Sequence, residues 1–257
     1  MLVAVGSWRG SPGVTTAILG LAEAWPTEAK VYVAECDPRG GTLVPRFLMP
    51  GPRGLAVLAG QARRGGDLRL LDQHAVSAPG GARVLTGPED GRQLCAALNA
   101  LLAPRGVFEQ AAEDPNTVLI TDVGRVDTDS PETASLLLLA DVLMLVVRPV
   151  REQILSLAGA NKQARRPHPA TGLLLIGPGY PAEHVAELLQ LPVFGELPLI
   201  PTGAAATWRR LTRRESFRNA AARAGQAVLA RFADEIPSAR SGVHDMAAVA
   251  SDGGAQV

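Results

Sequence analysis

The chain has 257 residues, its 25 lysines and arginines balance its 25 aspartates and glutamates, and 47% of its residues are hydrophobic. This composition excludes a disordered chain, and zero net charge excludes a general attraction to nucleic acid or anionic lipid. The two cysteines, Cys36 and Cys95, form no CxxC pair, which argues against a disulfide framework or a cysteine-rich zinc site. Together with the lack of a signal-peptide pattern, this predicts a cytoplasmic protein.

Short apolar segments of strand length alternate with helical segments along the chain. The predicted strands cover residues 2–5, 31–34, 83–86, 117–121, 142–147, 173–176 and 193–197. The predicted helices between them cover residues 15–25, 54–63, 91–102, 133–140, 153–162 and 181–189. The strands lack regular polar alternation, as expected when helices cover both faces of a sheet. The sequence therefore predicts an α/β fold, a three-layer α/β/α sandwich with a mostly parallel sheet.

The C-terminal part of the chain predicts one long helix at residues 204–234, with Phe217, Ala221 and Val228 packed against the sheet. The opposite face of this helix is rich in arginine, which suits either DNA phosphates or a solvated surface. The candidate DNA contacts are Arg209, Arg210, Arg213 and Arg214. Residues 236–257 are small and polar, which predicts a disordered tail after a single domain at 1–235.

The first predicted strand leads into a glycine-rich loop, residues 6–16 with the sequence GSWRGSPGVTT, and then into a helix. This layout is typical of a phosphate-binding loop, because backbone N–H groups converge there and the helix N-terminus adds partial positive charge. In the pattern GxxxxGK[ST], Gly13 matches the second glycine and Thr15 matches the hydroxyl residue. Trp8 stands at the first glycine and Val14 stands at the lysine, so the Walker A motif is degenerate.

The loop resembles the KGGxGKT[ST] loop of the ParA/MinD family of P-loop ATPases, and further segments follow in the family's order. Residues 31–40, VYVAECDPRG, resemble its DxDPQG motif, and residues 118–124, VLITDVG, resemble its Walker B strand. Later segments at 140–149 and 191–198 are also similar, and residues 84–89 resemble a stretch of MinD-like proteins that localise tight-adherence pili. The resemblance covers residues 1–235 and implies a P-loop NTPase fold.

The resemblance also implies roles for individual residues. The nucleotide-binding residues would be Arg9, Gly10, Ser11, Gly13, Val14, Thr15 and Thr16. Thr15, Asp37 and Asp122 would hold Mg²⁺, and the two aspartates would also be catalytic. Each of these three has an ordinary structural interpretation as well: Thr15 as a helix cap, Asp37 as the start of a turn and Asp122 as the end of a strand.

The substitution of the family's lysine by Val14 decides the leading hypothesis. A lost charge-assisted hydrogen bond to phosphate costs about 1.5–3 kcal/mol. We therefore expect a pseudo-ATPase, or a weak binder of ATP and Mg²⁺, that acts as a positioning scaffold for a partition, pilus or secretion component. One alternative is an active, divergent ATPase that works as a dimerisation switch, with Arg9 compensating. Another is a nucleoid or DNA-binding module that uses the basic helix. The expected partners are a second copy of the chain and another protein, without a membrane anchor.

Overall fold

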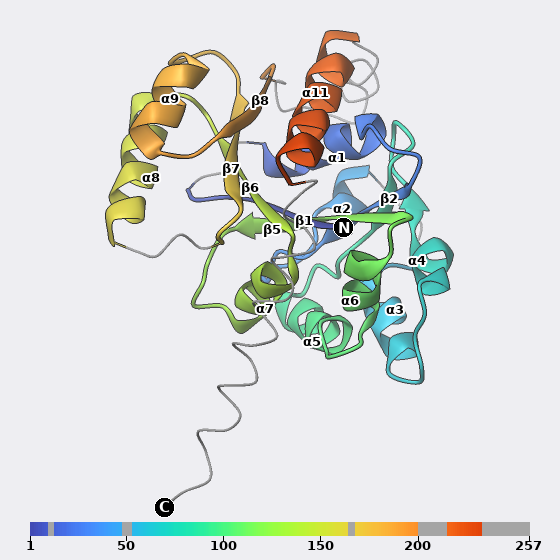
Figure 1. Ribbon diagram of the computed structural model, residues 1–257. Coiled ribbons are helices and arrows are strands. Elements are labelled where there is room, and N and C mark those ends of the chain that lie inside the picture. The colour runs from blue at the N-terminus through green and yellow to red at the C-terminus, as the bar shows by residue number, and fades with distance from the viewer. Residues whose placement is uncertain (10–12, 48–52, 164–167, 200–214, 233–257) are drawn as a thin grey trace, which may run out of the picture.

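The strands of the computed structural model form one sheet in the order β3-β4-β2-β5-β1-β6-β7-β8, with β1 near its centre (Figure 1). The structure describes residues 1–9, 13–47, 53–163, 168–199 and 215–232, without the side chains of 160–163 and 232. The strands are β1 Leu2–Ser7, β2 Lys30–Glu35, β3 Val76–Ser77, β4 Arg83–Leu85, β5 Thr117–Arg125, β6 Val142–Val147, β7 Thr171–Ile176 and β8 Val193–Leu197. Neighbouring strands are parallel except for the pair of β3 and β4.

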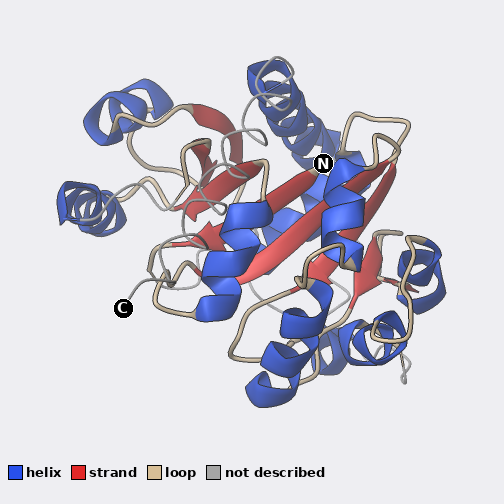
Figure 2. Cartoon of the chain, turned by 60° about the horizontal axis from the view of Figure 1, so that its bottom comes forward, coloured by secondary structure: helices blue, strands red, loops and turns tan. Residues whose placement is uncertain are grey.

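Helices cover both faces of the sheet (Figure 2). Those before β5 are α1 Val14–Ala24, α2 Leu43–Phe47, α3 Leu55–Ala62, α4 Arg69–His74, α5 Gly91–Leu101 and α6 Val107–Glu113. Those after β5 are α7 Pro131–Leu139, α8 Arg151–Gln163, α9 Ala182–Leu189 and α11 Glu215–Phe232. Crossover connections through a helix are the usual way to join parallel strands, so the order of elements itself favours two helical layers.

The side chains of each central strand alternate between two buried apolar clusters. Val3 and Val5 of β1 pack on the face that carries α1 and α11, whereas Leu2 and Ala4 pack on the face that carries α3 and α5 to α9. All six residues of β1 are buried. Because both faces exclude water, the strand has no polar side to display, which is why its sequence lacks alternation.

The predicted fold class is confirmed, and each predicted strand is present. The structure adds β3 and the helices α2, α4 and α6, which are short segments of two to seven residues with too little periodicity to detect. Strand β5 continues to Arg125, so the prediction that Asp122 ends a strand is wrong. Of the helix predicted at 204–234, the described part is α11; the tail at 236–257 lies outside the described residues.

Helix α11 packs as its sequence predicts. Phe217, Ala221, Ala224 and Val228 are all buried in the cluster that also contains α1. Across the described ranges, no helix combines the length and the apolar character needed to cross a membrane.

Candidate functional site

The candidate site lies where the carboxyl ends of β1, β2 and β5 meet. Asp122 of β5 pairs in register with Val5 of β1 on one side and with Glu35 of β2 on the other. The loop after β1 leads to α1 and the loop after β2 carries Asp37, so both loops leave the sheet at this edge. In open parallel sheets, ligands bind at this edge, beside the point where the strand order reverses.

Helix α1 begins without a side-chain cap. Its N-cap residue is Gly13, whose φ of 102° is readily adopted only by glycine, and no side chain bonds to the first N–H groups. The alternative interpretation of Thr15 as a helix cap is therefore wrong. The uncapped first turn keeps the partial positive charge of the helix N-terminus available to an anion.

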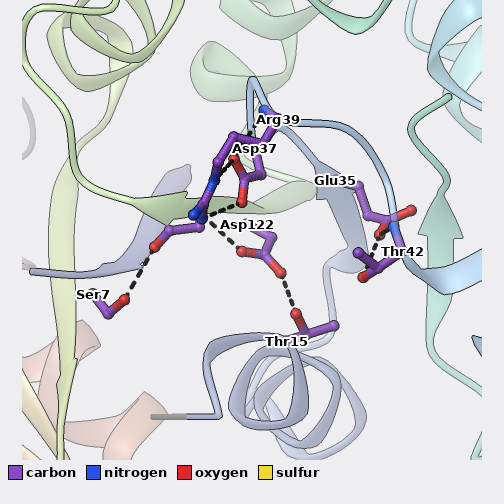
Figure 3. A network of polar contacts seen from close by, with 8 residues as sticks. Ser7, Thr15, Glu35, Asp37, Arg39, Thr42 and Asp122 are labelled. Atoms are coloured by element: carbon purple, nitrogen blue, oxygen red, sulfur yellow. Dashed lines mark hydrogen bonds and ion pairs between the residues drawn. The ribbon is translucent and has the colours of Figure 1, made fainter. Parts of the chain in front are cut away.

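Thr15 instead joins α1 to the buried carboxylate of β5 (Figure 3). Its hydroxyl donates a hydrogen bond of 2.8 Å to Oδ2 of Asp122, and the backbone N–H of Gly124 donates one of 2.9 Å to Oδ1. Asp122 is 5% exposed. Burial raises the pKa of Asp122 to about 6; the two hydrogen bonds oppose this rise, and the nearby Glu35 and Asp37 add to it. A hydroxyl and a carboxylate in contact are the kind of oxygen ligands that Mg²⁺ prefers.

Asp37 is bound by an arginine two residues later (Figure 3). Nε of Arg39 donates to Oδ1 of Asp37 at 3.0 Å, and a terminal nitrogen donates to Oδ2 at 2.7 Å. The backbone N–H of Arg39 adds a third bond to Oδ1, and Gly40 N–H donates to the carbonyl of Asp37, so Asp37 also starts a turn. The hydrogen bonds that Arg39 donates to Asp37 raise the pKa of Arg39 above its ordinary range. Both carboxylate oxygens of Asp37 are therefore paired with one guanidinium.

Val14 lies at the head of α1 with its side chain in the apolar core. It is 7% exposed and belongs to the cluster shared by α1 and α11. Trp8 is half-buried and packs against the cluster on the opposite face of the sheet. Position 14 thus contributes hydrophobic burial rather than charge, and the bulk of Trp8 rests on a core cluster to which α1 does not belong.

The remaining predicted nucleotide-binding residues are only partly placed. Arg9 is exposed, and Thr16 is half-buried in the first turn of α1. Gly10 and Ser11 lie outside the described residues, as do all four candidate DNA contacts, Arg209, Arg210, Arg213 and Arg214. The structure therefore brings together Gly13, Val14, Thr15, Thr16 and Asp122, with Asp37 beside them.

Three residues near the site were missed by the sequence analysis. Glu35 is buried and its carboxylate accepts backbone bonds from Thr42, Leu43 and Gly87 at 2.7, 2.9 and 3.1 Å. Burial raises its pKa, and these backbone hydrogen bonds oppose the rise.

Arg46 of α2 reaches Thr16, with 3.4 Å between a guanidinium nitrogen and the hydroxyl. Arg148 follows β6, which neighbours β1. An acid at a strand end gave a signal for Glu35, and Arg148 lies within the family-like segment 140–149, whereas Arg46 belongs to no motif in the sequence.

Solved structures with this architecture include proteins named MinD and ParA. The septum site-determining protein MinD from Pyrococcus horikoshii OT3, complexed with Mg-ADP, aligns over 92% of this chain and 96% of its own, with a TM-score of 0.66 and 17% identity. A ParA family ATPase from Chlorobium tepidum TLS aligns over 87% and 97%, with a TM-score of 0.62 and 12% identity.

The chain has the MinD/ParA fold. A chain of the MinC:MinD cell division protein complex from Aquifex aeolicus also aligns, over 89% of this chain and 95% of its own, with a TM-score of 0.54 and 14% identity. No family model and no curated protein matches the sequence. At these identities the MinD/ParA fold is retained while most side chains differ, so the chemistry of the site has to be argued from its own residues.

Proposed function

We propose that this chain is a pseudo-ATPase of the MinD/ParA fold that binds nucleoside phosphates weakly, hydrolyses ATP slowly and acts as a positioning scaffold. The observation that carries this proposal is the placement of Val14. An aliphatic side chain buried in the core takes the position at which the phosphate-binding loop pattern has a lysine. Phosphoryl transfer depends on positioning and on neutralising charge, so removal of that cation affects turnover more than binding.

The residues present fit a phosphate group and Mg²⁺ in part. The uncapped first turn of α1 offers backbone N–H groups to phosphate oxygens, and the hydroxyls of Thr15 and Thr16 lie in the same turn. Thr15 and Asp122, already joined at 2.8 Å, would hold Mg²⁺. When bound, Mg²⁺ would neutralise phosphate charge. This is why we propose weak binding rather than complete loss of binding.

The pairing of Asp37 with Arg39 supports the proposal that ATP hydrolysis is slow. A general base or a residue that positions water needs a carboxylate oxygen able to accept a further hydrogen bond in the right direction. Arg39 engages both oxygens of Asp37 and also neutralises its charge. We propose that Asp37 and Asp122 are the residues of a former catalytic pair, and that Arg39 holds Asp37 in an unreactive state.

The scaffold part of the proposal concerns partners. The fold is shared with a chain of the MinC:MinD complex, in which one protein binds another of different sequence. We propose that this chain forms a homodimer and also binds a protein of a partition, pilus or secretion system in the cytoplasm. Cross-linking followed by mass spectrometry on the native complex would identify that partner.

A second candidate function is an active ATP-dependent switch. It is favoured by the intact hydrogen bond between Thr15 and Asp122, which preserves the oxygen ligands for Mg²⁺. In this alternative an arginine replaces the missing lysine and the chain hydrolyses ATP at the rate of a working ATPase. The rate of phosphate release separates the two candidates, because slow release is expected only of the first.

Replacement of Val14 by lysine tests the proposal. We expect Val14→Lys to raise the affinity for Mg-ATP about tenfold or more, because it restores a charge-assisted contact to phosphate. Isothermal titration calorimetry measures the affinity, and a phosphate-release assay measures turnover of the wild type and the variant. Val14→Met, of similar length without charge, is the matched control.

The outcomes of this test are distinct. Wild-type turnover as fast as that of an ordinary ATPase would disprove the pseudo-ATPase assignment and support the switch. Equal affinities for the wild type, Val14→Lys and Val14→Met would mean that the charge at position 14 does not limit binding. Thermal melts of all three proteins show whether the lysine is tolerated at this buried position.

A further inference from the structure

We propose that Arg46 supplies the positive charge that Val14 cannot, and that it binds the phosphate groups of a nucleoside di- or triphosphate at the first turn of α1. The inference rests on the proposed function, since it names the residue that holds the same ligand. It differs from the compensation by Arg9 in the alternative of an active ATPase, because Arg46 comes from a different loop and helix.

The side chain of Arg46 lies at the first turn of α1. One terminal nitrogen of its guanidinium is 3.4 Å from Oγ1 of Thr16, the third residue of that helix. No carboxylate of the described residues forms an ion pair with Arg46. Its guanidinium carbon lies 5.3 Å from the centre of the Phe47 ring, a cation–π contact that leaves the charge in place. An exposed, unneutralised cation beside an uncapped helix N-terminus attracts an anion from both sides.

Helix α2 is held in this position by a buried acid. Oε1 of Glu35 accepts hydrogen bonds from the backbone N–H groups of Thr42, just before α2, and of Leu43, its first residue. The N–H of Gly87, after β4, binds the other oxygen of Glu35. Glu35 is 4% exposed, so this connection is shielded from water. Arg46 is therefore presented on a short helix whose origin is fixed to the same sheet edge as α1.

The other arginines of this edge are less suited to the role. The guanidinium of Arg39 already donates hydrogen bonds to both carboxylate oxygens of Asp37. Arg9 is exposed, and no hydrogen bond or ion pair joins its side chain to another described residue. Arg148 lies beyond β6, its backbone N–H donates to Gln153 of α8, and its Nε is buried without a hydrogen-bond partner among the described residues. Only Arg46 among these four contacts the first turn of α1 within the described ranges.

Affinity measurements with four variants test the inference. Isothermal titration calorimetry with Mg-ATP and with Mg-ADP would compare the wild type, Arg46→Ala, Arg46→Lys, Arg9→Ala and Arg148→Ala. We expect Arg46→Ala to lower the affinity for both ligands about tenfold. This is near the lower end of the effect of a charge-assisted hydrogen bond, because the side chain is exposed to water. Arg46→Lys should retain most of the affinity, and Arg9→Ala and Arg148→Ala should each weaken binding less than Arg46→Ala does.

A matched control accounts for the loss of one positive charge elsewhere. Arg69, at the start of α4 on the opposite face of the sheet, has a side chain that is 85% exposed and pairs with Asp67. Arg69→Ala changes the net charge as Arg46→Ala does, and we expect it to leave both affinities unchanged. Thermal melts of Arg46→Ala and Arg69→Ala should match that of the wild type, since both residues lie on the surface.

The failure of this inference is separable from the failure of the proposed function. If the wild type binds nucleotide and Arg46→Ala binds equally well, the role of Arg46 is disproved while weak nucleotide binding stands. A loss confined to Arg9→Ala or Arg148→Ala would assign the charge to that residue and overturn the inference. If the wild type binds neither Mg-ATP nor Mg-ADP, both the inference and the nucleotide-binding part of the proposed function fail.

Discussion

Single residues at the carboxyl edge of the sheet combine burial with charge. Asp122 is nearly inaccessible to water, and its carboxylate is held by one hydroxyl and one backbone N–H. Glu35 is also buried, and its carboxylate accepts hydrogen bonds from the backbone N–H groups of Thr42 and Leu43 rather than from α1. Val14 is buried as well but brings no charge. The edge therefore has two buried acids, and Arg39 pairs with a third, Asp37.

The raised pKa of Asp122 predicts a specific pH dependence of stability. Its folded pKa of about 6 exceeds the ordinary value of 3.8, so between these values the folded protein holds a proton that the unfolded chain has lost. The stabilising contribution of Asp122 is therefore fully present below pH 4 and falls as pH rises through 6, by about 3 kcal/mol. The free energy of unfolding, measured by urea titration from pH 4 to pH 7, checks this.

Asp122→Asn isolates the contribution of this one group. Glu35 also has a raised pKa, whereas the pKa values of His74 and His168 are lowered by burial, which makes stability rise with pH. These other groups are present in both proteins and cancel when the variant is subtracted from the wild type. The difference should fall from pH 4 to pH 7, and a difference that stays flat would contradict the assignment.

Among the elements, α11 packs against α1, the helix whose N-terminus lies at the candidate site (Figure 1). Phe217 of α11 packs directly against Gly20 of α1, where even a Cβ would overlap the ring. Phe217 is 3% exposed and Gly20 is buried. The absence of a side chain on Gly20 is thus what lets the two helices approach, and the ring in turn supports α1 behind its N-terminus.

Truncation of Phe217 tests this packing. We expect Phe217→Ala to lower the free energy of unfolding by about 3–5 kcal/mol, because it removes a buried ring and leaves a cavity between two helices. Urea unfolding of the variant measures the change. Arg218→Ala on the exposed face of the same helix should change stability by less than about 0.5 kcal/mol. A small effect of Phe217→Ala would mean that α1 and α11 do not depend on one another.

At the scale of the whole molecule, the strand order decides where a ligand can bind. The chain passes from β1 to β2 on one side of the sheet and reaches β6, β7 and β8 on the other. The direction reverses at the carboxyl ends of β1 and β6, which is where open parallel sheets bind their ligands. The loop before α1, the Asp37 loop and Arg148 all belong to this edge, so binding there would restrain several elements together.

A thermal melt with nucleotide tests the binding of the whole domain. A ligand at ten times its dissociation constant stabilises the folded state by about 1.4 kcal/mol. For a domain of this size that corresponds to a rise in Tm of about 3–6 °C. We expect Mg-ADP at such a concentration to produce this rise in the wild type, with adenosine, which lacks phosphates, as the control. An equal rise with adenosine would show that phosphate is not what the site recognises.

The sequence alone determined the sheet, the two-sided covering of its strands and the approximate place of the site. Apolar runs such as that of β1 can be satisfied only between two helical layers, and glycine-rich turns after a strand are readable from residue types. The sequence also identified Thr15, Asp37 and Asp122 as candidates and Val14 as the missing cation. It could not find the two-residue β3 or the short helices, because a segment of that length has no periodicity.

Only the tertiary structure decided how these residues are paired. Whether Thr15 caps its helix or binds Asp122 depends on the distance between α1 and β5, which are separated by about a hundred residues of chain. The contact of Arg46 with Thr16 and the connection of Glu35 to α2 likewise depend on loops that meet only when the sheet is assembled. Charge pairing falls off with distance in space, and the order of residues along the chain does not set that distance.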